Sequence, residues 1–185
     1  SDKLTHYLRL KSDGIMISSK TLNIDNPKLN CRLEGFNQFS PKRIILDRNL
    51  QIDLKSYIAK SIKNKNTIIF HNSNDKSKIK LLKKRGTTLI KQSTDKYKNL
   101  DLKKILKDLY KMEIRNLLVE GGDILTKNFI QKKLFNEFYV FRSSKNLSKN
   151  KKHVNFTSFS ILNTKYNKHK INSKLATDKL TIYKN

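Results

Sequence analysis

The sequence lacks several features that would place the protein in a membrane or in an oxidising compartment. Cys31 is the only cysteine among 185 residues, so no internal disulfide can form, which is consistent with a reducing cytoplasm. No apolar run approaches the roughly 18 residues that a membrane span needs, and no signal peptide precedes the first apolar segment. The four histidines are scattered, without a second ligand at close spacing, so a zinc site is not expected. The sequence predicts a cytoplasmic protein with no membrane contact.

Arginine is scarce, although the chain is strongly basic. The formal net charge is +26, yet 34 of the 41 basic residues are lysine and seven are arginine. Clustered basic residues are typical of nucleic-acid binding, but arginine is the residue favoured for two-point phosphate and base contacts, and these lysines are spread along the whole chain. We interpret most of the charge as a solvated surface that attracts anionic ligands. A basic nucleic-acid-binding module stays open as an alternative.

Short apolar segments of strand length alternate with amphipathic segments as far as Glu120. Strands are expected at GIMIS, RIILD, NTIIFHN, TTLIK and NLLVE, which are residues 14–18, 43–47, 66–72, 87–91 and 116–120. Helices are expected at 2–11, near 54–62, in the Lys-rich stretch before Gly86 and at 100–110. The last is the clearest, because its apolar residues recur at the spacing of a core-facing stripe. A polar loop that contains Pro27 is expected between the first two of these strands. The alternation predicts a three-layer α/β/α domain with a mostly parallel central sheet.

The C-terminal part has a different pattern. EFYVFR, VNFTSFSIL and KLTIYK, residues 137–142, 154–162 and 179–184, are predicted strands with little helix between them. Such strands predict an antiparallel edge that closes the central sheet. We expect one domain over residues 1–185.

Two of the five glycines stand side by side in LLVEGGDIL, residues 117–125. They follow a predicted strand and precede a helical stripe, and ligands of open α/β sheets bind at such corners. Gly121 and Gly122 would let the backbone approach a ligand, and the helix N-terminus would favour a phosphate. A tight turn without a ligand stays open. Glu120, at the strand end, is either exposed at the rim or holds hydroxyl or N–H groups of a ligand.

The stretch SDGIMISSKTLNIDNPKLNCR, residues 12–32, together with RIILD and LLVEGGDIL in that order, resembles the reductase domain of the bifunctional riboflavin-biosynthesis deaminase/reductase. The family pattern T-x-x-x-D-[DN]-P-x-L-x-x-R is met here by Thr21, Asp25, Asn26, Pro27, Leu29 and Arg32. The resemblance implies a dihydrofolate-reductase-like fold, a homodimer and NADPH as cofactor. It implies reduction of the ribosyl group of 5-amino-6-(5-phosphoribosylamino)uracil, a phosphoribosyl-pyrimidine, to the ribityl form.

The resemblance also assigns roles to individual residues. The residues expected to contact the cofactor are Thr21, Asp25, Gly122, Asp123, Ile124, Leu125, Thr126, Lys127 and Asn128. Those expected to bind the substrate are Arg9, Leu29, Arg32 and Glu120, with the two arginines on its phosphate. Asp25 and Glu120 are the candidate catalytic residues that supply a proton, with Asp25 favoured and water as an alternative.

The sequence departs from the family in several ways. Arg48 stands where the family often has serine, and we hypothesise that it pairs with the 2′-phosphate of NADPH. Asp123 puts a negative charge where a pyrophosphate is expected, so it must point away. No H-x-E or P-C-x-x-C motif of the zinc deaminase is found, and the family's first strand and loop are missing, so we expect a fragment. A non-catalytic remnant of the reductase fold that still dimerises is the remaining alternative.

Overall fold

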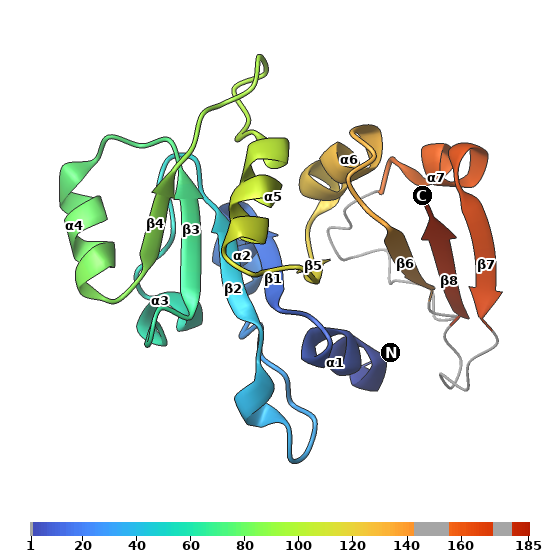
Figure 1. The fold of residues 1–185 in the computed structure, drawn as a ribbon, viewed down its shortest axis with the longest axis horizontal. Helices are drawn as coiled ribbons and strands as arrows, with labels where there is room; N and C mark the ends of the chain where they lie inside the picture. The colour runs from blue at the N-terminus through green and yellow to red at the C-terminus, as the bar shows by residue number, and fades with distance from the viewer. Residues whose placement is uncertain (1, 143–155, 172–178) are drawn as a thin grey trace, which may run out of the picture. The chain divides into compact units, whose positions relative to one another are not determined.

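The computed structural model describes residues 2–142, 156–171 and 179–185 (Figure 1). These residues belong to two compact units, Asp2–Gly121 and Gly122–Asn185. Among the described helices, none combines the length and the apolar character that crossing a bilayer requires.

The first unit is built on a sheet of five parallel strands. They are β1 (Gly14–Ser18), β2 (Lys42–Leu46), β3 (Thr67–His71), β4 (Thr88–Lys91) and β5 (Leu117–Val119), in the order β4-β3-β2-β1-β5. In the register of the sheet, Gly14 lies opposite Lys42 on one side and Leu117 on the other. The inner strand β1 therefore pairs on one side with β5, the strand of this sheet that lies farthest from it in the sequence.

The central strands are buried because both faces of the sheet are covered. The apolar residues of β1, β2 and β3 are buried in the core, except for the half-buried Leu46, as expected of the inner strands of a parallel sheet. Gly14 opens β1 where there is no room for a side chain: a Cβ there would lie 2.6 Å from Cδ1 of Ile44. Close packing between neighbouring strands thus accounts for this glycine.

The helices of the first unit are α1 (Asp2–Leu10), α2 (Ser19–Asp25), α3 (Tyr57–Lys60), α4 (Lys76–Lys84) and α5 (Leu102–Lys111), with a short 3-10 helix at Asn37–Phe39. The predicted stripe of α5 is confirmed, since Leu102, Ile105 and Leu109 are buried. Asp101 caps its first turn by accepting hydrogen bonds from two backbone N–H groups. In Figure 1, α5 lies in front of the sheet and α2 behind it, so helices cover both faces.

Helix α2 lies in a segment that the sequence pattern indicated to be a loop, and that interpretation was wrong for residues 19–25. The helix is specified by its ends. Ser18 caps it, because its hydroxyl accepts a hydrogen bond from the N–H of Thr21 at 3.2 Å, and Asn26 ends it in the left-handed conformation with φ of 42°. Leu22 is the only buried residue of α2, so the sequence of this helix has no apolar stripe from which it could be predicted.

The second unit contains α6 (Asp123–Gln131), β6 (Glu137–Arg142), α7 (Phe159–Lys165), β7 (Asn167–Ile171) and β8 (Lys179–Lys184). The strands form a three-stranded antiparallel sheet in the order β6-β8-β7. The predicted strands at 137–142 and 179–184 are confirmed, but in the described part of the chain they pair in this separate sheet and do not extend the edge of the parallel sheet as expected. The expected α/β class, with a parallel central sheet and antiparallel C-terminal strands, is thereby confirmed.

The predicted strand at 154–162 was wrong over its last part, and residues 154 and 155 lie outside the described residues. The chain is helical at Phe159–Lys165, where Leu162 is fully buried against Ile130 and Tyr183. Residues 154–162 largely alternate between apolar and polar side chains, as in a strand. A short helix that buries one apolar side chain, here Leu162, is compatible with the same sequence. Local periodicity cannot separate the two over so few residues.

Candidate active site

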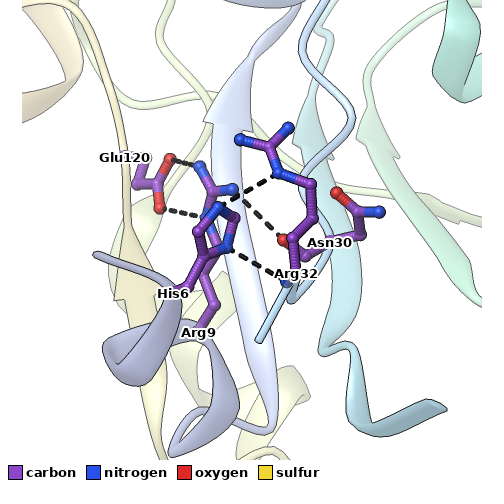
Figure 2. Close-up of polar contacts among 5 residues, drawn as sticks. All are labelled: His6, Arg9, Asn30, Arg32 and Glu120. Carbon is purple, nitrogen blue, oxygen red and sulfur yellow. Dashed lines mark hydrogen bonds and ion pairs between the residues drawn. The ribbon is translucent and has the colours of Figure 1, made fainter. Parts of the chain in front are cut away.

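Arg9 and Glu120 form a two-point ion pair in the first unit (Figure 2). The Nε and Nη2 atoms of Arg9 donate hydrogen bonds to Oε1 and Oε2 of Glu120 at 2.8 and 2.7 Å. The Nη1 atom of Arg9 donates to the main-chain oxygen of Asn30 at 3.2 Å. The hydrogen bond with Glu120 is the main reason why the pKa of Arg9 is raised. Two residues that were each expected to bind substrate therefore also bind one another.

The sheet explains why Glu120 lies at this place. Its N–H donates to the main-chain oxygen of Met16 at 3.0 Å, which continues the pairing of β5 with β1 by one residue. At the other end of β5, the carboxylate of Asp13 accepts from the N–H groups of Arg115 and Asn116 at 2.9 and 2.8 Å. Glu120 thus sits at the carboxyl edge of the sheet, where open α/β sheets bind their ligands.

His6 connects Arg32 to the same cluster. It precedes Arg9 by three positions on α1, so the two side chains lie on one face of that helix. Its imidazole is within hydrogen-bond distance of Arg32 at both nitrogens: the backbone N–H approaches Nδ1 at 3.2 Å and the Nε–H approaches Nε2 at 3.1 Å. Figure 2 shows both guanidinium groups beside this ring. The structure therefore brings together three of the four predicted substrate-binding residues, Arg9, Arg32 and Glu120.

His6 is surrounded by positive charge. Its side chain is buried, with 5% of the residue exposed. Burial lowers the pKa of His6 below its ordinary value, and the charges of Arg9 and Arg32 lower it further. The neutral form of the imidazole is therefore favoured at pH 7.

The loop that carries Arg32 is held in an unusual backbone conformation. Asn26 and Leu29 have φ of 42° and 52°, in the left-handed region that costs an L-residue about 1 kcal/mol or more. Leu29 offsets this because its side chain, 2% exposed, packs in the hydrophobic core. Asn26 accepts a hydrogen bond from the N–H of Tyr57 at 2.7 Å. The predicted contact of Leu29 with substrate is thus left to its main chain.

Thr21 and Asp25 both lie on α2, which follows β1 directly and so begins at the carboxyl edge of the sheet. Thr21 is half-buried, and its hydroxyl lies 3.1 Å from that of Ser18. Asp25, in the last turn of the helix, is exposed. Arg48 follows β2 on the surface and donates to Oδ1 of Asn49 at 3.2 Å and to the main-chain oxygen of Lys98. The hydrogen bonds of Arg48 in the described residues therefore do not involve Thr21 or Asp25.

The glycine turn opens α6 in the second unit. Gly122 is the N-cap, with φ of −69° and ψ of 173°, a conformation open to any residue. Its use here therefore depends on the missing side chain and not on a left-handed backbone. The carboxylate of Asp123, in the first turn of α6, has a partner within the second unit: its Oδ1 accepts a hydrogen bond from the N–H of Thr157 at 3.2 Å.

The remaining predicted cofactor residues of α6 differ in exposure. Leu125 is buried, so only its main chain is available to a ligand, whereas Ile124 and Lys127 are exposed. Thr126 is half-buried, and the side chain of Asn128 donates to the main-chain oxygen of Ile124 at 2.9 Å. These contacts concern the second unit alone.

Sequence reasoning missed His6 and Asn30. The spacing of His6 and Arg9 on one helix face is the signal that would have found the histidine. Asn30 contributes its main chain to Arg9, for which the sequence carries no signal. In the described part of the chain, no three His, Cys, Asp or Glu side chains gather as a group that could hold a metal ion.

Comparison with known proteins identifies relatives of this chain. The family model of the RibD C-terminal domain matches residues 1–173. The riboflavin biosynthesis protein RibD of Aquifex aeolicus is 30% identical over 145 residues, which are 78% of this chain and 38% of that protein. The 2,5-diamino-6-ribosylamino-4(3H)-pyrimidinone 5′-phosphate reductase of the same organism is 29% identical over 136 residues, which are 73% of this chain and 58% of that protein. The chain thus spans less than two thirds of either relative.

Solved structures share the fold. Acinetobacter baumannii RibD superposes with a TM-score of 0.76 at 19% identity, covering 99% of this chain and 49% of that one. The Saccharomyces cerevisiae riboflavin biosynthesis reductase superposes with a TM-score of 0.73 at 22% identity, covering 99% of this chain and 80% of that one. The fold of this chain is thus the fold of these riboflavin-biosynthesis proteins. Because the family model matches nearly the whole length, the chain belongs to the RibD C-terminal domain family.

Proposed function

We propose that this chain reduces the ribosyl group of 5-amino-6-(5-phosphoribosylamino)uracil to the ribityl form, with NADPH as the reductant, in riboflavin biosynthesis. Its relatives are named as riboflavin biosynthesis proteins and as reductases of a phosphorylated ribosylaminopyrimidinone. The observation that carries the proposal is the cluster of Arg9, Arg32 and Glu120, which three separate segments bring to the carboxyl edge of the sheet.

The cluster suits a phosphorylated sugar. Glu120 balances the charge of Arg9, so Arg32 supplies the positive charge that a phosphate requires, and a guanidinium fork matches the geometry of phosphate oxygens. Arg9 uses three of its five N–H donors on Glu120 and Asn30, so two remain for the ligand. The carboxylate of Glu120 retains lone pairs that can accept hydrogen bonds from substrate hydroxyl or amino groups.

The residues of α6 fit a dinucleotide phosphate. The N-cap of α6, Gly122, makes no side-chain hydrogen bond to the N–H groups of the first turn of that helix. These N–H donors therefore suit a pyrophosphate. The carboxylate of Asp123 accepts hydrogen bonds from Thr157, which lessens the repulsion expected between this carboxylate and a pyrophosphate. In the first unit, Thr21 and Asp25 would contact the cofactor and Arg48 would bind its 2′-phosphate. NADPH would supply the hydride.

Reduction needs a proton as well as a hydride. The hydride is received by C1′ of the opened sugar, and the proton must reach the nitrogen or the ring oxygen. Glu120 has both carboxylate oxygens bonded to Arg9, which suits it to accept hydrogen bonds and not to give up a proton. Asp25 is the favoured donor because the resemblance implies that it lies nearest the nicotinamide, with water as the alternative. We further propose that the protein is a cytoplasmic homodimer.

The test is a turnover assay on the purified chain. Incubation with the substrate and NADPH should consume the reduced cofactor and yield a product heavier by two hydrogen atoms in mass spectrometry. One of the two should be deuterium when the cofactor carries deuterium at C4 of the nicotinamide, and NADH is the matched control. NADPH binding without turnover would indicate a non-catalytic remnant of the fold. DNA binding that survives about 0.2 M salt, without a thermal shift from NADPH, would instead indicate a nucleic-acid-binding module.

A further inference from the structure

We propose that His6 is a positioning residue that holds the Arg32 side chain ready for the phosphate of the substrate. The proposal rests on the proposed function in one respect, that Arg32 binds this phosphate. His6 itself is buried and needs no contact with the ligand.

Hydrogen-bond chemistry limits what His6 can do. Both of its ring nitrogens face Arg32, at 3.2 Å from the main-chain nitrogen and 3.1 Å from Nε. A neutral imidazole has a single acceptor nitrogen, so only one of these bonds forms at a time. With the proton on Nδ1, the acceptor is Nε2 and the side chain of Arg32 is held. A protonated ring accepts neither bond.

The bond to Nε orients the guanidinium in a useful way. It occupies the inner edge of the group and leaves the terminal nitrogens Nη1 and Nη2, which have no hydrogen-bond partner among the described residues. These two atoms form the fork that binds phosphate oxygens. Arg32 is otherwise exposed, and an exposed arginine loses rotamer entropy when it binds. Fixing Nε beforehand removes part of that loss.

The neighbouring charges keep the ring in the form that this task requires. Arg9 from α1 and Arg32 from the loop after α2 both disfavour a charged imidazole, as does burial. Asp2 on α1 and a hydrogen bond with the main chain of Asn30 act in the opposite sense but are smaller influences. His6 is thus a neutral acceptor between two cations.

The experiment compares two substitutions of His6 in the full chain. Phenylalanine fills a similar space but accepts no hydrogen bond, so His6→Phe should raise the KM for the phosphorylated substrate about tenfold and leave kcat nearly unchanged. His6→Gln keeps an acceptor oxygen and should recover part of the loss. The control is His169→Gln, which removes an exposed histidine on β7 and should behave as wild type. Melting temperatures establish that each variant is folded.

A double variant tests whether His6 acts through Arg32. If it does, His6→Phe combined with Arg32→Ala should bind substrate no more weakly than Arg32→Ala alone. Additive losses would overturn the proposal, and so would a fall in kcat with KM unchanged.

Nitrogen NMR of the histidines separates this proposal from the proposed function, because it needs no substrate. The expected result is a neutral His6 with its proton on Nδ1 and a hydrogen-bonded Nε–H on Arg32. A proton on Nε2 would overturn the proposal. If the wild type shows no turnover, titration with inorganic phosphate gives the same comparison: His6→Phe should bind it about tenfold more weakly, and equal affinities would refute the role.

Discussion

Arg9 and Glu120 are 111 positions apart in the sequence, yet two hydrogen bonds of 2.8 and 2.7 Å join their side chains. The pair ties the last turn of α1 to the end of β5, at the edge of the sheet where the proposed substrate binds. Its side chains are mostly buried, 12% exposed in Arg9 and 28% in Glu120. It therefore belongs both to the fold and to the proposed site.

We expect this pair to contribute to stability and to binding in different ways. Arg9→Glu or Glu120→Arg alone should lower the free energy of unfolding by about 1–3 kcal/mol, because each leaves like charges facing one another at a largely buried place. The double reversal should recover part of the stability while the KM for substrate stays high. Urea unfolding and kinetics measure the two effects. Glu137→Gln, which breaks the exposed pair with Lys184, is the control and should change stability by less than about 0.5 kcal/mol.

The proposed proton donor can be separated from a cofactor ligand. Asp25→Asn keeps the size of the side chain but cannot release a proton at neutral pH, so kcat should fall by roughly 100-fold while the Kd for NADPH changes little. Turnover measurements and a fluorescence titration check this. An equal loss of both would show that Asp25 serves cofactor binding alone.

Arg48 should distinguish NADPH from NADH. Removing the guanidinium in Arg48→Ala should raise the KM for NADPH about tenfold, because a charge-assisted contact to the 2′-phosphate is lost, and leave the KM for NADH unchanged. Arg115→Ala is the control, since Arg115 is an exposed arginine that lies over the ring of Tyr110 at 5.2 Å. If the KM values for NADPH and NADH rise equally, Arg48 does not bind the 2′-phosphate.

The role of the glycine turn depends on space and not on backbone conformation. Gly122→Ala should cost less than about 1 kcal/mol of stability, since φ of −69° suits alanine. It should nevertheless weaken NADPH binding about tenfold if the main chain approaches the cofactor closely. Gly86→Ala is the contrasting variant, because φ of 87° strains an L-residue and should destabilise the fold by about 1 kcal/mol or more. Unfolding curves and an NADPH titration separate the two outcomes, and unchanged affinity in Gly122→Ala would remove the argument for a cofactor turn.

Two buried histidines should make stability depend on pH. Burial lowers the pKa of His6 and of His71 below the ordinary value of 6.5. Between the lowered and the ordinary pKa the unfolded chain binds more protons than the folded protein, so stability is fully present above about pH 6.5 and decreases as the pH falls towards the folded values. Melting temperatures across this window measure the effect. His6→Phe should flatten the dependence, whereas His169→Gln should not.

Much of the fold was predictable because its strands are apolar along their whole length. Strands β1, β2 and β3 bury continuous apolar segments and α5 buries an apolar stripe, and a parallel sheet covered on both faces demands that pattern of its inner strands. Elements specified by their ends or by few contacts were missed. Helix α2 depends on Ser18 and Asn26 at its termini, and β7 is a polar strand whose place is set by pairing with β8.

The candidate site was predictable only as far as its charged side chains. The family pattern pointed to Arg9, Arg32 and Glu120, and the structure gathers them. The family pattern could not show that Arg9 binds Glu120, because that contact depends on the pairing of β5 with β1, which are far apart in the sequence. The bond between His6 and Arg32 likewise joins a helix to a loop 26 positions away.

The placement of β1 between β2 and β5 has a consequence for synthesis on the ribosome. The N-terminal half can emerge and pair in the order β4-β3-β2-β1, but the edge of β1 that pairs with β5 stays bare until the segment Leu117–Val119 leaves the exit tunnel. A bare apolar edge is a template for association with other chains. We therefore expect a nascent chain of this protein to be most exposed to aggregation, and most in need of chaperones, just before its last parallel strand leaves the exit tunnel.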